Sequence, residues 1–340
     1  MRPEPAGRPP TGRLLRATLG YLLAFALTGV AFVWTAPGQR LDGGLLPRAE
    51  RGGGYEQPTD LVEPAKAVLA WFGDPLVLGL GLGTVLLLAV LSGRVRAGLA
   101  GVALVGVTVL GAGLAKQVII RPDLGVVTST THNSFPSGHV AAAMALLLAL
   151  LLVLPARARW WFALPGAAGV STVAAATMIA GWHRFSDVVG AVLLAAALFC
   201  LAAVTSARPG TGAAARPGTG AAAPLAQPGK DAAAAAARPG TRAATGTAGP
   251  AGAALGLLGL LGGLPHLAPA VPGGLFIAIT AAGGLVVLVV AAVLVLVVPV
   301  DFGPGCGRPG SAAPEPDARA GGRRPAPPNM IDKATSAGMP

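Results

Sequence analysis

Long apolar runs separated by short polar stretches fill residues 14–205 of the chain. A helix needs about 20 consecutive apolar residues to cross a bilayer, and most of these runs approach that length. Their expected bounds are Leu14–Ala36, Pro75–Leu91, Leu99–Ala115, His139–Leu154, Trp160–Ala180 and Asp187–Val204. The pattern therefore predicts an all-α protein, a polytopic transmembrane helical bundle with a six-span core over residues 14–205.

The first apolar run admits two interpretations. It is longer than the core of about 7–15 residues that a secretory signal peptide carries. We therefore expect a retained first span that follows a cytoplasmic N-terminus, residues 1–13, and keep a cleaved signal ending near Ala36 as the alternative. A polar loop is expected over residues 37–65, and Ala67–Phe72 is expected to lead into the second span as an interfacial turn.

The remainder of the chain changes character. Residues 206–250 consist mainly of Ala, Gly, Pro and Thr, and lack the large apolar residues that would offset the entropy of ordering, so a disordered linker is expected. Residues 251–300 form a second apolar block that ends in the long run Gly273–Val300. We predict a helical hairpin there, or a single span, followed by a disordered tail over residues 301–340.

Composition supports a membrane protein and argues against a nucleic-acid partner. Hydrophobic residues make up 53% and charged residues 11%, which is too little charge to cover a water-facing surface. The net charge is +11, but the basic residues are scattered and aromatic residues make up only 5%, so no basic face for nucleic acid is evident. The excess of Ala, Gly, Pro and Arg is typical of a GC-rich bacterial genome, so we expect a bacterial plasma membrane.

Basic residues alternate between the two sides of the predicted bundle. By the positive-inside rule, the arginine-rich loops lie in the cytoplasm. These arginines are Arg2, Arg8, Arg13, Arg94, Arg96, Arg157, Arg159, Arg208 and Arg216. Lys116, Arg121 and Arg184 fall on the opposite, external side. Because basic residues in these places oppose the topology rule, an anionic ligand explains them better than orientation does.

Three polar motifs interrupt the apolar core. The first contains Lys116 and Arg121-Pro122, the second is Ser134-Phe135-Pro136-Ser137-Gly138-His139, and the third runs from Gly181 through His183 to Asp187. Ionisable groups near hydrocarbon cost a few kcal/mol, so they mark functional sites by default. The two cysteines, Cys200 and Cys306, have no spacing that indicates a zinc site or a disulfide framework.

The order of these motifs resembles that of the type-2 phosphatidic acid phosphatase superfamily, which includes membrane lipid-phosphate phosphatases and soluble vanadium haloperoxidases. The resemblance covers about residues 75–205. It implies hydrolysis of a lipid phosphate or pyrophosphate through a phosphohistidine, with His183 as the nucleophile, Asp187 as its orienting partner and His139 as the general acid. Undecaprenyl pyrophosphate, phosphatidic acid and phosphatidylglycerophosphate are the expected kinds of substrate.

The residue types agree with these roles. His183 and Asp187 stand four apart, so they share a helical face if the first turn of the sixth span includes both. Ser137 and Gly138 open the fourth span, where free helix amides form an anion site. Arg121 offers a planar fork for phosphate oxygens. The resemblance places these last three residues at the phosphate.

The chain departs from the family pattern at two places. The family lysine stands seven residues before the arginine, a position that Leu114 occupies here, and Lys116 is five before. Two residues turn a helical side chain by about 200°, so Lys116 is expected to reach the phosphate only if this segment is not a regular helix. The family Ser-Arg pair falls on Ala176 and Thr177, and Arg184 is the candidate replacement for the missing arginine.

Several alternatives remain open at this level. A non-catalytic lipid-phosphate binding or scaffold protein would keep the same anion pocket. A vanadium-dependent haloperoxidase is disfavoured because the known ones are soluble, and a transporter because no mid-membrane charge pairs are evident. We expect no cofactor and no metal, since no carboxylate cluster for magnesium appears. His132, Asn133 and His266 are interpreted as loop residues, the first two with a possible place at the pocket mouth.

Overall fold

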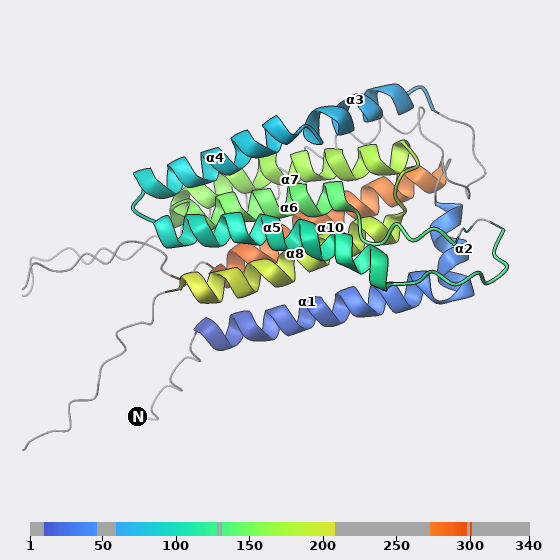
Figure 1. Ribbon diagram of the computed structural model, residues 1–340, viewed down its shortest axis with the longest axis horizontal. Coiled ribbons are helices and arrows are strands. Elements are labelled where there is room, and N and C mark those ends of the chain that lie inside the picture. The colour runs from blue at the N-terminus through green and yellow to red at the C-terminus, as the bar shows by residue number, and fades with distance from the viewer. Residues whose placement is uncertain are drawn as a thin grey trace, which may run out of the picture. The chain divides into compact units, whose positions relative to one another are not determined.

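The computed structural model describes residues 10–45, residues 59–207 other than 128 and 130, residues 273–297 and Val300. Within these residues the fold is entirely helical, which confirms the predicted class (Figure 1). The helices are α1 (Pro10–Val33), α2 (Ala36–Gly44), α3 (Val62–Phe72), α4 (Pro75–Leu91), α5 (Val95–Val118), α6 (Gly138–Val153), α7 (Ala156–Ile179), α8 (Phe185–Ser206) and α10 (Gly273–Val297). Nearly all of the predicted linker, the first half of the predicted hairpin and the predicted tail lie outside the described residues.

The length and apolar character of the helices indicate a multi-pass membrane protein. α1, α5, α7, α8 and α10 are each long and apolar enough to cross a bilayer, and α3 with α4 makes a sixth span if this pair, bent by 54°, is taken as one. α6 was predicted as a span but has 16 residues, whereas α5 and α7 have 24. At 1.5 Å per residue α6 is about 12 Å shorter than its neighbours.

The position of α6 along the bundle follows from its C-terminal end. Arg94, at the start of α5, donates from Nη1 to the carbonyl of Leu154 at 2.7 Å. Arg159, in the first turn of α7, donates from Nε to the same carbonyl at 3.0 Å. Because α6 ends level with the starts of α5 and α7, its beginning lies well inside the opposite end of the bundle. That recess leaves room for polar loops.

The region predicted as a polar loop over residues 37–65 contains helical structure, so that prediction is wrong in part. α2 starts directly after α1, because Thr35 caps it by accepting from the amide of Gly38 at 3.1 Å and Pro37 suits a first helical turn. Gln39 and Asp42 of this short helix are fully buried.

The bend between α3 and α4 has a local cause. Pro75 has no amide hydrogen to continue α3, and Asp74 begins a new helix by accepting from the amide of Leu76 at 2.8 Å. The predicted interfacial turn at Ala67–Phe72 is therefore part of a regular helix. α3 packs on α7, whereas α4 packs mainly on α5.

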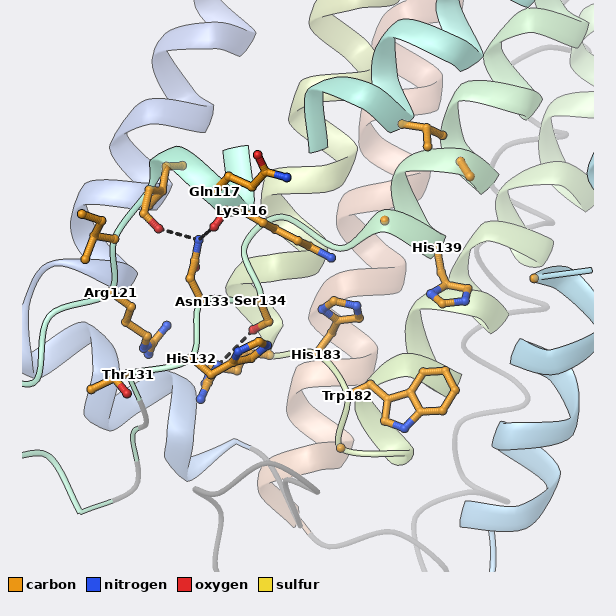
Figure 2. Close-up of a pocket in the computed structure, with 18 of the residues that line it drawn as sticks. Lys116, Gln117, Arg121, Thr131, His132, Asn133, Ser134, His139, Trp182 and His183 are labelled. Atoms are coloured by element: carbon orange, nitrogen blue, oxygen red, sulfur yellow. Dashed lines mark hydrogen bonds between the residues drawn. The ribbon is translucent and has the colours of Figure 1, made fainter. Parts of the chain in front are cut away.

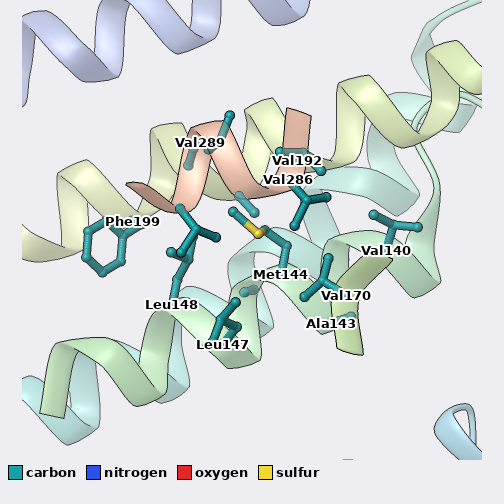
Figure 3. Close-up of a cluster of buried hydrophobic side chains, with 14 of the residues drawn as sticks. Val140, Ala143, Met144, Leu147, Leu148, Val170, Val192, Phe199, Val286 and Val289 are labelled. Atoms are coloured by element: carbon teal, nitrogen blue, oxygen red, sulfur yellow. The ribbon is translucent and has the colours of Figure 1, made fainter. Parts of the chain in front are cut away.

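The core is built around α6, which is apolar on every side after His139 because other helices surround it. Figure 3 shows Met144 and Leu148 of α6 among side chains from α7, α8 and α10. The apolar segment predicted near the C-terminal end of the chain thus contributes α10 to the same core, where Val286 and Val289 are buried.

α10 runs in the same direction as α8. Its second residue, Gly274, lies so close to α2 that a Cβ there would be 3.0 Å from the carbonyl oxygen of Gly44. At its other end, the carbonyl of Val297 accepts from Nη1 of Arg159 at 3.2 Å. α10 therefore extends from the end of the bundle near α2 to the end where α7 begins. The hairpin stays a prediction, because its first half lies outside the described residues.

Candidate active site

The three polar motifs meet around one cavity of about 960 Å³ at the end of the bundle where α6 begins (Figure 2). Most of the predicted site residues line this cavity. They are Lys116, Arg121, Gly138, His139, His183 and Arg184. Ser137 and Asp187 are fully buried behind its wall.

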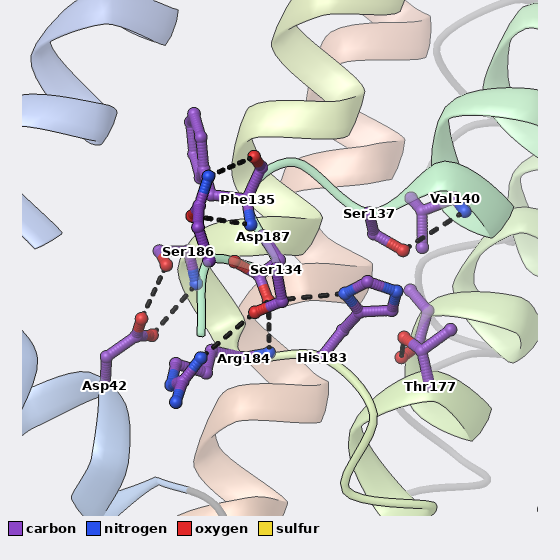
Figure 4. Close-up of polar contacts among 12 residues, drawn as sticks. Asp42, Ser134, Phe135, Ser137, Val140, Thr177, His183, Arg184, Ser186 and Asp187 are labelled. Carbon is purple, nitrogen blue, oxygen red and sulfur yellow. Dashed lines mark hydrogen bonds and ion pairs between the residues drawn. The ribbon is translucent and has the colours of Figure 1, made fainter. Parts of the chain in front are cut away.

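His183 does not belong to α8, so the condition under which it would share a helical face with Asp187 is not met. The helix begins at Phe185, and His183 lies in the turn before it. The two side chains nevertheless meet, with His183 Nδ1 3.3 Å from Asp187 Oδ2 (Figure 4). The turn between α7 and α8, and not a helical register, produces this contact.

Gly181 makes that turn possible. It has a positive φ of 68°, a conformation that glycine adopts without a steric penalty, and it follows Ala180, the C-cap residue of α7. The carbonyl of Thr177 then accepts from the amides of Trp182 at 3.0 Å and of His183 at 3.2 Å. The end of α7 thus holds the backbone of His183 in place.

Asp187 gathers several donors on one oxygen. Its Oδ2 accepts from Ser134 Oγ at 2.6 Å and from the backbone amide of Arg184 at 2.8 Å, and it also faces His183. The hydrogen bond from the amide of Arg184 caps the first turn of α8. Asp187 is therefore held from two sides, which orients the carboxylate toward the imidazole. Ser134 opens the second polar motif, but no role was predicted for it from the sequence.

Ser137 joins the second motif to the third. Its hydroxyl caps α6 by accepting from the amide of Val140 at 3.5 Å, and its own amide donates to the carbonyl of Asp187 at 2.9 Å. Its predicted contact with phosphate stays a prediction. Gly138, the next residue, does line the cavity.

His139 lies at the side of the cavity formed by the bend between α3 and α4. A Cβ at Gly73 would be 3.4 Å from Nε2 of His139. The ring of Trp182 lies on another side, with ring centroids 5.8 Å apart. These neighbours keep His139 pointed toward the same space as His183 (Figure 2).

Lys116 reaches the cavity although it belongs to a regular helix. It lies two residues before the end of α5, and its Nζ is 3.9 Å from where a Cβ of Gly138 would be. The expectation that it reaches only from an irregular segment is wrong, because a lysine stem of four carbons is long and flexible. Leu114, at the family lysine position, is exposed and does not line the cavity.

Two guanidinium groups line the cavity and are almost fully buried. Arg121 is 2% exposed and donates from Nε to Ser129 Oγ at 3.2 Å, but its Nη1 and Nη2 have no hydrogen-bond partner among the described residues. Burial and the nearby charge of Arg184 lower the pKa of Arg121 from its usual value. Arg184 donates from Nη1 to Ser134 Oγ at 3.0 Å. Because burying a cation costs free energy, an anion bound in the cavity would stabilise both groups.

The position of the missing family arginine is not at the cavity. Thr177 is fully buried, and its hydroxyl donates to the carbonyl of Ala174 at 2.8 Å. The guanidinium of Arg184 approaches the cavity from the other side of His183. Arg184 does line the cavity, and its role as a substitute for the missing arginine stays a prediction.

His132 and Asn133 both line the cavity, as the alternative interpretation of this loop expected. Asn133 also holds the loop. Its Nδ2 donates to the carbonyl of Ile119 at 2.8 Å, and its Oδ1 accepts from the amide of Phe135 at 3.1 Å. In the described part of the chain, no three His, Cys, Asp or Glu side chains lie close enough together to hold a metal ion.

Sequence reasoning missed Asp42, which contacts the site from α2. Its two carboxylate oxygens accept from the amide and the hydroxyl of Ser186, the residue before Asp187 (Figure 4). The only signal in the sequence was an acidic residue soon after the first apolar run, and no spacing linked it to the motifs.

The fold and the cavity together define a class, a multi-pass helical membrane protein with a basic cavity that three histidines line. The family model of the PAP2 superfamily matches residues 97–209, which include every motif residue at the cavity. This part of the chain is thus similar to the PAP2 superfamily, the family whose motif order the sequence resembles. The comparisons with curated proteins and with solved structures gave no match. This match and the apolar helices fit a membrane phosphatase.

Proposed function

We propose that the protein is an integral-membrane phosphatase that hydrolyses a lipid phosphate or pyrophosphate through a phosphohistidine. One observation carries the proposal. His183, whose Nδ1 faces Asp187 at 3.3 Å, lines the same cavity as Arg121, whose Nη1 and Nη2 are buried without a partner among the described residues. A buried cation is costly unless an anion pairs with it, and phosphate oxygens match the guanidinium fork.

The first chemical step is attack by His183. The carboxylate of Asp187 favours a proton on Nδ1, so Nε2 keeps its lone pair and can form a bond to phosphorus. As this N–P bond forms, the P–O bond to the leaving group breaks, and His139 gives a proton to the departing oxygen. Arg121 and Arg184 stabilise the negative charge on the remaining phosphoryl oxygens, with Lys116, Gly138 and Ser137 as the further predicted contacts.

The second step releases phosphate. Water attacks phosphorus, a P–O bond forms and the N–P bond to His183 breaks. The proton lost by water goes to His139, which returns to its acid form. The cycle consumes one water for each ester or anhydride bond and needs no other reactant.

The apolar part of the cavity supports a lipid substrate. Phe72, Leu78, Val109 and Ala142 line it together with the polar residues. An acyl or prenyl chain can lie against such side chains while its phosphate contacts the basic end. The arginine distribution supports a site on the external face of the membrane.

The test is inorganic phosphate release by the purified full chain in detergent from a panel of lipid phosphates and pyrophosphates. We expect release from one lipid class, loss of release in His183→Ala, and inhibition by vanadate, which mimics trigonal-bipyramidal phosphorus. His266→Ala is the matched control, since His266 lies outside residues 97–209.

Two outcomes contradict the proposal. If a folded protein releases no phosphate from any lipid, the non-catalytic binding alternative replaces it. If activity is complete in the presence of vanadate, or survives in His183→Ala, the phosphohistidine mechanism is wrong.

A further inference from the structure

The short helix α2 lies outside residues 97–209, yet it contacts the segment that carries the candidate nucleophile. Oδ1 of Asp42 accepts from the amide of Ser186 at 3.0 Å, and its Oδ2 accepts from the hydroxyl of Ser186 at 2.5 Å. Asp42 and Ser186 are both fully buried. The two bonds to one residue make this a specific contact between α2 and the start of α8.

The corner between α1 and α2 also contacts the chain on either side of Arg121. Trp34 donates from Nε1 to the carbonyl of Ile120 at 2.8 Å. Gln39 donates from Nε2 to the carbonyl of Pro122 at 3.1 Å. This corner therefore connects the segment of Arg121 to the first turn of α8.

Ser186 occupies a position from which it controls the candidate catalytic pair. It is the second residue of α8, and Asp187 follows it. The first amides of a helix have no partner inside the helix, so an external acceptor decides how firmly the turn is held. If the first turn shifts, the carboxylate of Asp187 moves relative to the ring of His183.

The charge of Asp42 also matters to the cavity. Asp42 and Asp187 both lie at the N-terminus of α8, where the helix dipole favours negative charge. Arg184 and Arg121 are the cations that Asp42 attracts. Two buried carboxylates thus accompany two buried guanidinium groups, and both cations stay near the place where a phosphate would bind.

We propose that Asp42 is a positioning residue of the active site. By accepting both hydrogen bonds from Ser186, it holds the first turn of α8 so that Asp187 keeps the imidazole of His183 in one orientation. The kinetic consequence rests on the proposed phosphatase function, whereas the effect on the imidazole does not.

The kinetic test compares Asp42→Ala, Asp42→Asn and Ser186→Ala in the full chain. Asp123→Asn is the matched control, because Asp123 is exposed and its carboxylate likewise accepts from a backbone amide, that of Gly125 at 3.0 Å. We expect kcat to fall about 100-fold in Asp42→Ala, since a small misplacement of a reacting group has that effect. Asp42→Asn keeps an oxygen that can accept from the amide of Ser186, and Ser186→Ala keeps that amide, so kcat should fall less in both variants.

If Asp42 only positions Asp187 and His183, its loss should lower kcat but leave substrate binding unchanged. The KM of the lipid substrate and the inhibition by vanadate should change by less than about threefold, because Arg121 and Arg184 remain in place. Wild-type kcat in Asp42→Ala would overturn the proposal. So would a parallel loss of kcat, vanadate inhibition and thermal stability in all three variants.

The closing experiment does not depend on activity. The chain has four histidines, so ¹⁵N-histidine NMR of the full chain in detergent gives few signals, and His183→Ala assigns the one of interest. We expect His183 to carry its proton on Nδ1 in the wild type and in Asp123→Asn, and to show mixed tautomers in Asp42→Ala. An unchanged His183 signal overturns the positioning role even if phosphate release is observed. A changed signal in a protein without phosphate release supports it and rejects only the proposed function.

Discussion

At the scale of single residues, the backbone of Thr177 contributes to the site, although the family pattern has an arginine side chain at this position. Thr177 replaces an arginine of the family pattern, and its carbonyl holds the amide of His183 at 3.2 Å. Arg184, which follows His183 in the sequence, lines the cavity. Under the proposed function, Arg184 would supply the phosphate contact that the family pattern assigns to the position of Thr177.

Arg184→Ala tests this exchange. The variant loses one charged donor for the developing phosphoryl charge, so we expect kcat/KM to fall about 10²- to 10³-fold. Arg184→Lys should recover only part of it, since an ammonium cannot contact Ser134 and phosphate with the geometry of a fork. Steady-state kinetics of phosphate release provide the measurement.

A matched control for Arg184 is Arg96→Ala. Arg96 is exposed and donates to the carbonyl of Thr205 at the end of the bundle opposite the cavity. Unchanged kcat/KM in Arg184→Ala would show that phosphate binding uses the other cations alone.

The pH dependence of stability has a contribution from Asp42. Burial, and then the nearby charge of Asp187, raise the pKa of Asp42 from its usual value to about 6. A raised carboxyl pKa means that the folded state binds the proton more tightly, so the stabilisation is complete below pH of about 4 and is lost as pH rises through about 6. Asp42→Asn cannot titrate.

We therefore expect the thermal midpoint of the wild type, relative to that of Asp42→Asn, to fall between pH of about 4 and 6 and to stay constant above that range. Thermal unfolding of both proteins in detergent across this range measures the difference, and other carboxylates cancel in the comparison. A difference that rises with pH in this window would contradict the assignment.

At the scale of elements, Phe135 seats the loop between α5 and α6 against two helices. Its ring lies 5.1 Å from the ring of Phe25 in α1, measured between centroids. On α8, a Cβ at Gly190 would be 2.3 Å from Phe135 Cε2, so only glycine leaves room for this ring. The contacts of Phe135 thereby fix the position of this loop, which ends in Ser137, along the axis of α8.

Gly190→Ala should displace Phe135 and the loop with it. We expect a destabilisation of about 1–3 kcal/mol, as for other overpacked sites, together with reduced phosphate release. Gly106→Ala is the control, since no atom lies within 4 Å of a Cβ there. Wild-type stability and activity in Gly190→Ala would show that the loop tolerates a shift of Phe135.

At the scale of the whole molecule, arginines at one end of the bundle oppose the cavity at the other. Arg94 and Arg159 donate to the last carbonyls of α6, and Arg159 also donates to the last carbonyl of α10. These residues therefore satisfy helix C-termini in addition to marking the side that the positive-inside rule assigns to the cytoplasm.

Cysteine labelling tests this orientation. In a background that lacks Cys200 and Cys306, Asp123→Cys and Arg157→Cys place single thiols at exposed positions near opposite ends of the bundle. We expect a membrane-impermeant thiol reagent applied to intact cells to modify Asp123→Cys but not Arg157→Cys until the cells are opened. The reverse pattern would move the site to the cytoplasmic face.

Local sequence was sufficient for the helical class, most of the spans and the motif residues of the cavity. Apolar runs report burial in lipid or core directly, and polar residues such as His139 and His183 stand out against them because their burial is costly. The basic character of the cavity was also predictable, because Arg121 and Arg184 oppose the charge rule that the other arginines follow.

Only the tertiary structure decided how these residues meet. The contact of His183 with Asp187 depends on the turn at Gly181, and the reach of Lys116 depends on its long side chain lying beside Gly138 at the start of α6. Asp42 approaches Ser186 from 144 positions away in the sequence. Such contacts arise from the packing of separate helices, and neither hydrophobic period nor motif spacing carries information about them.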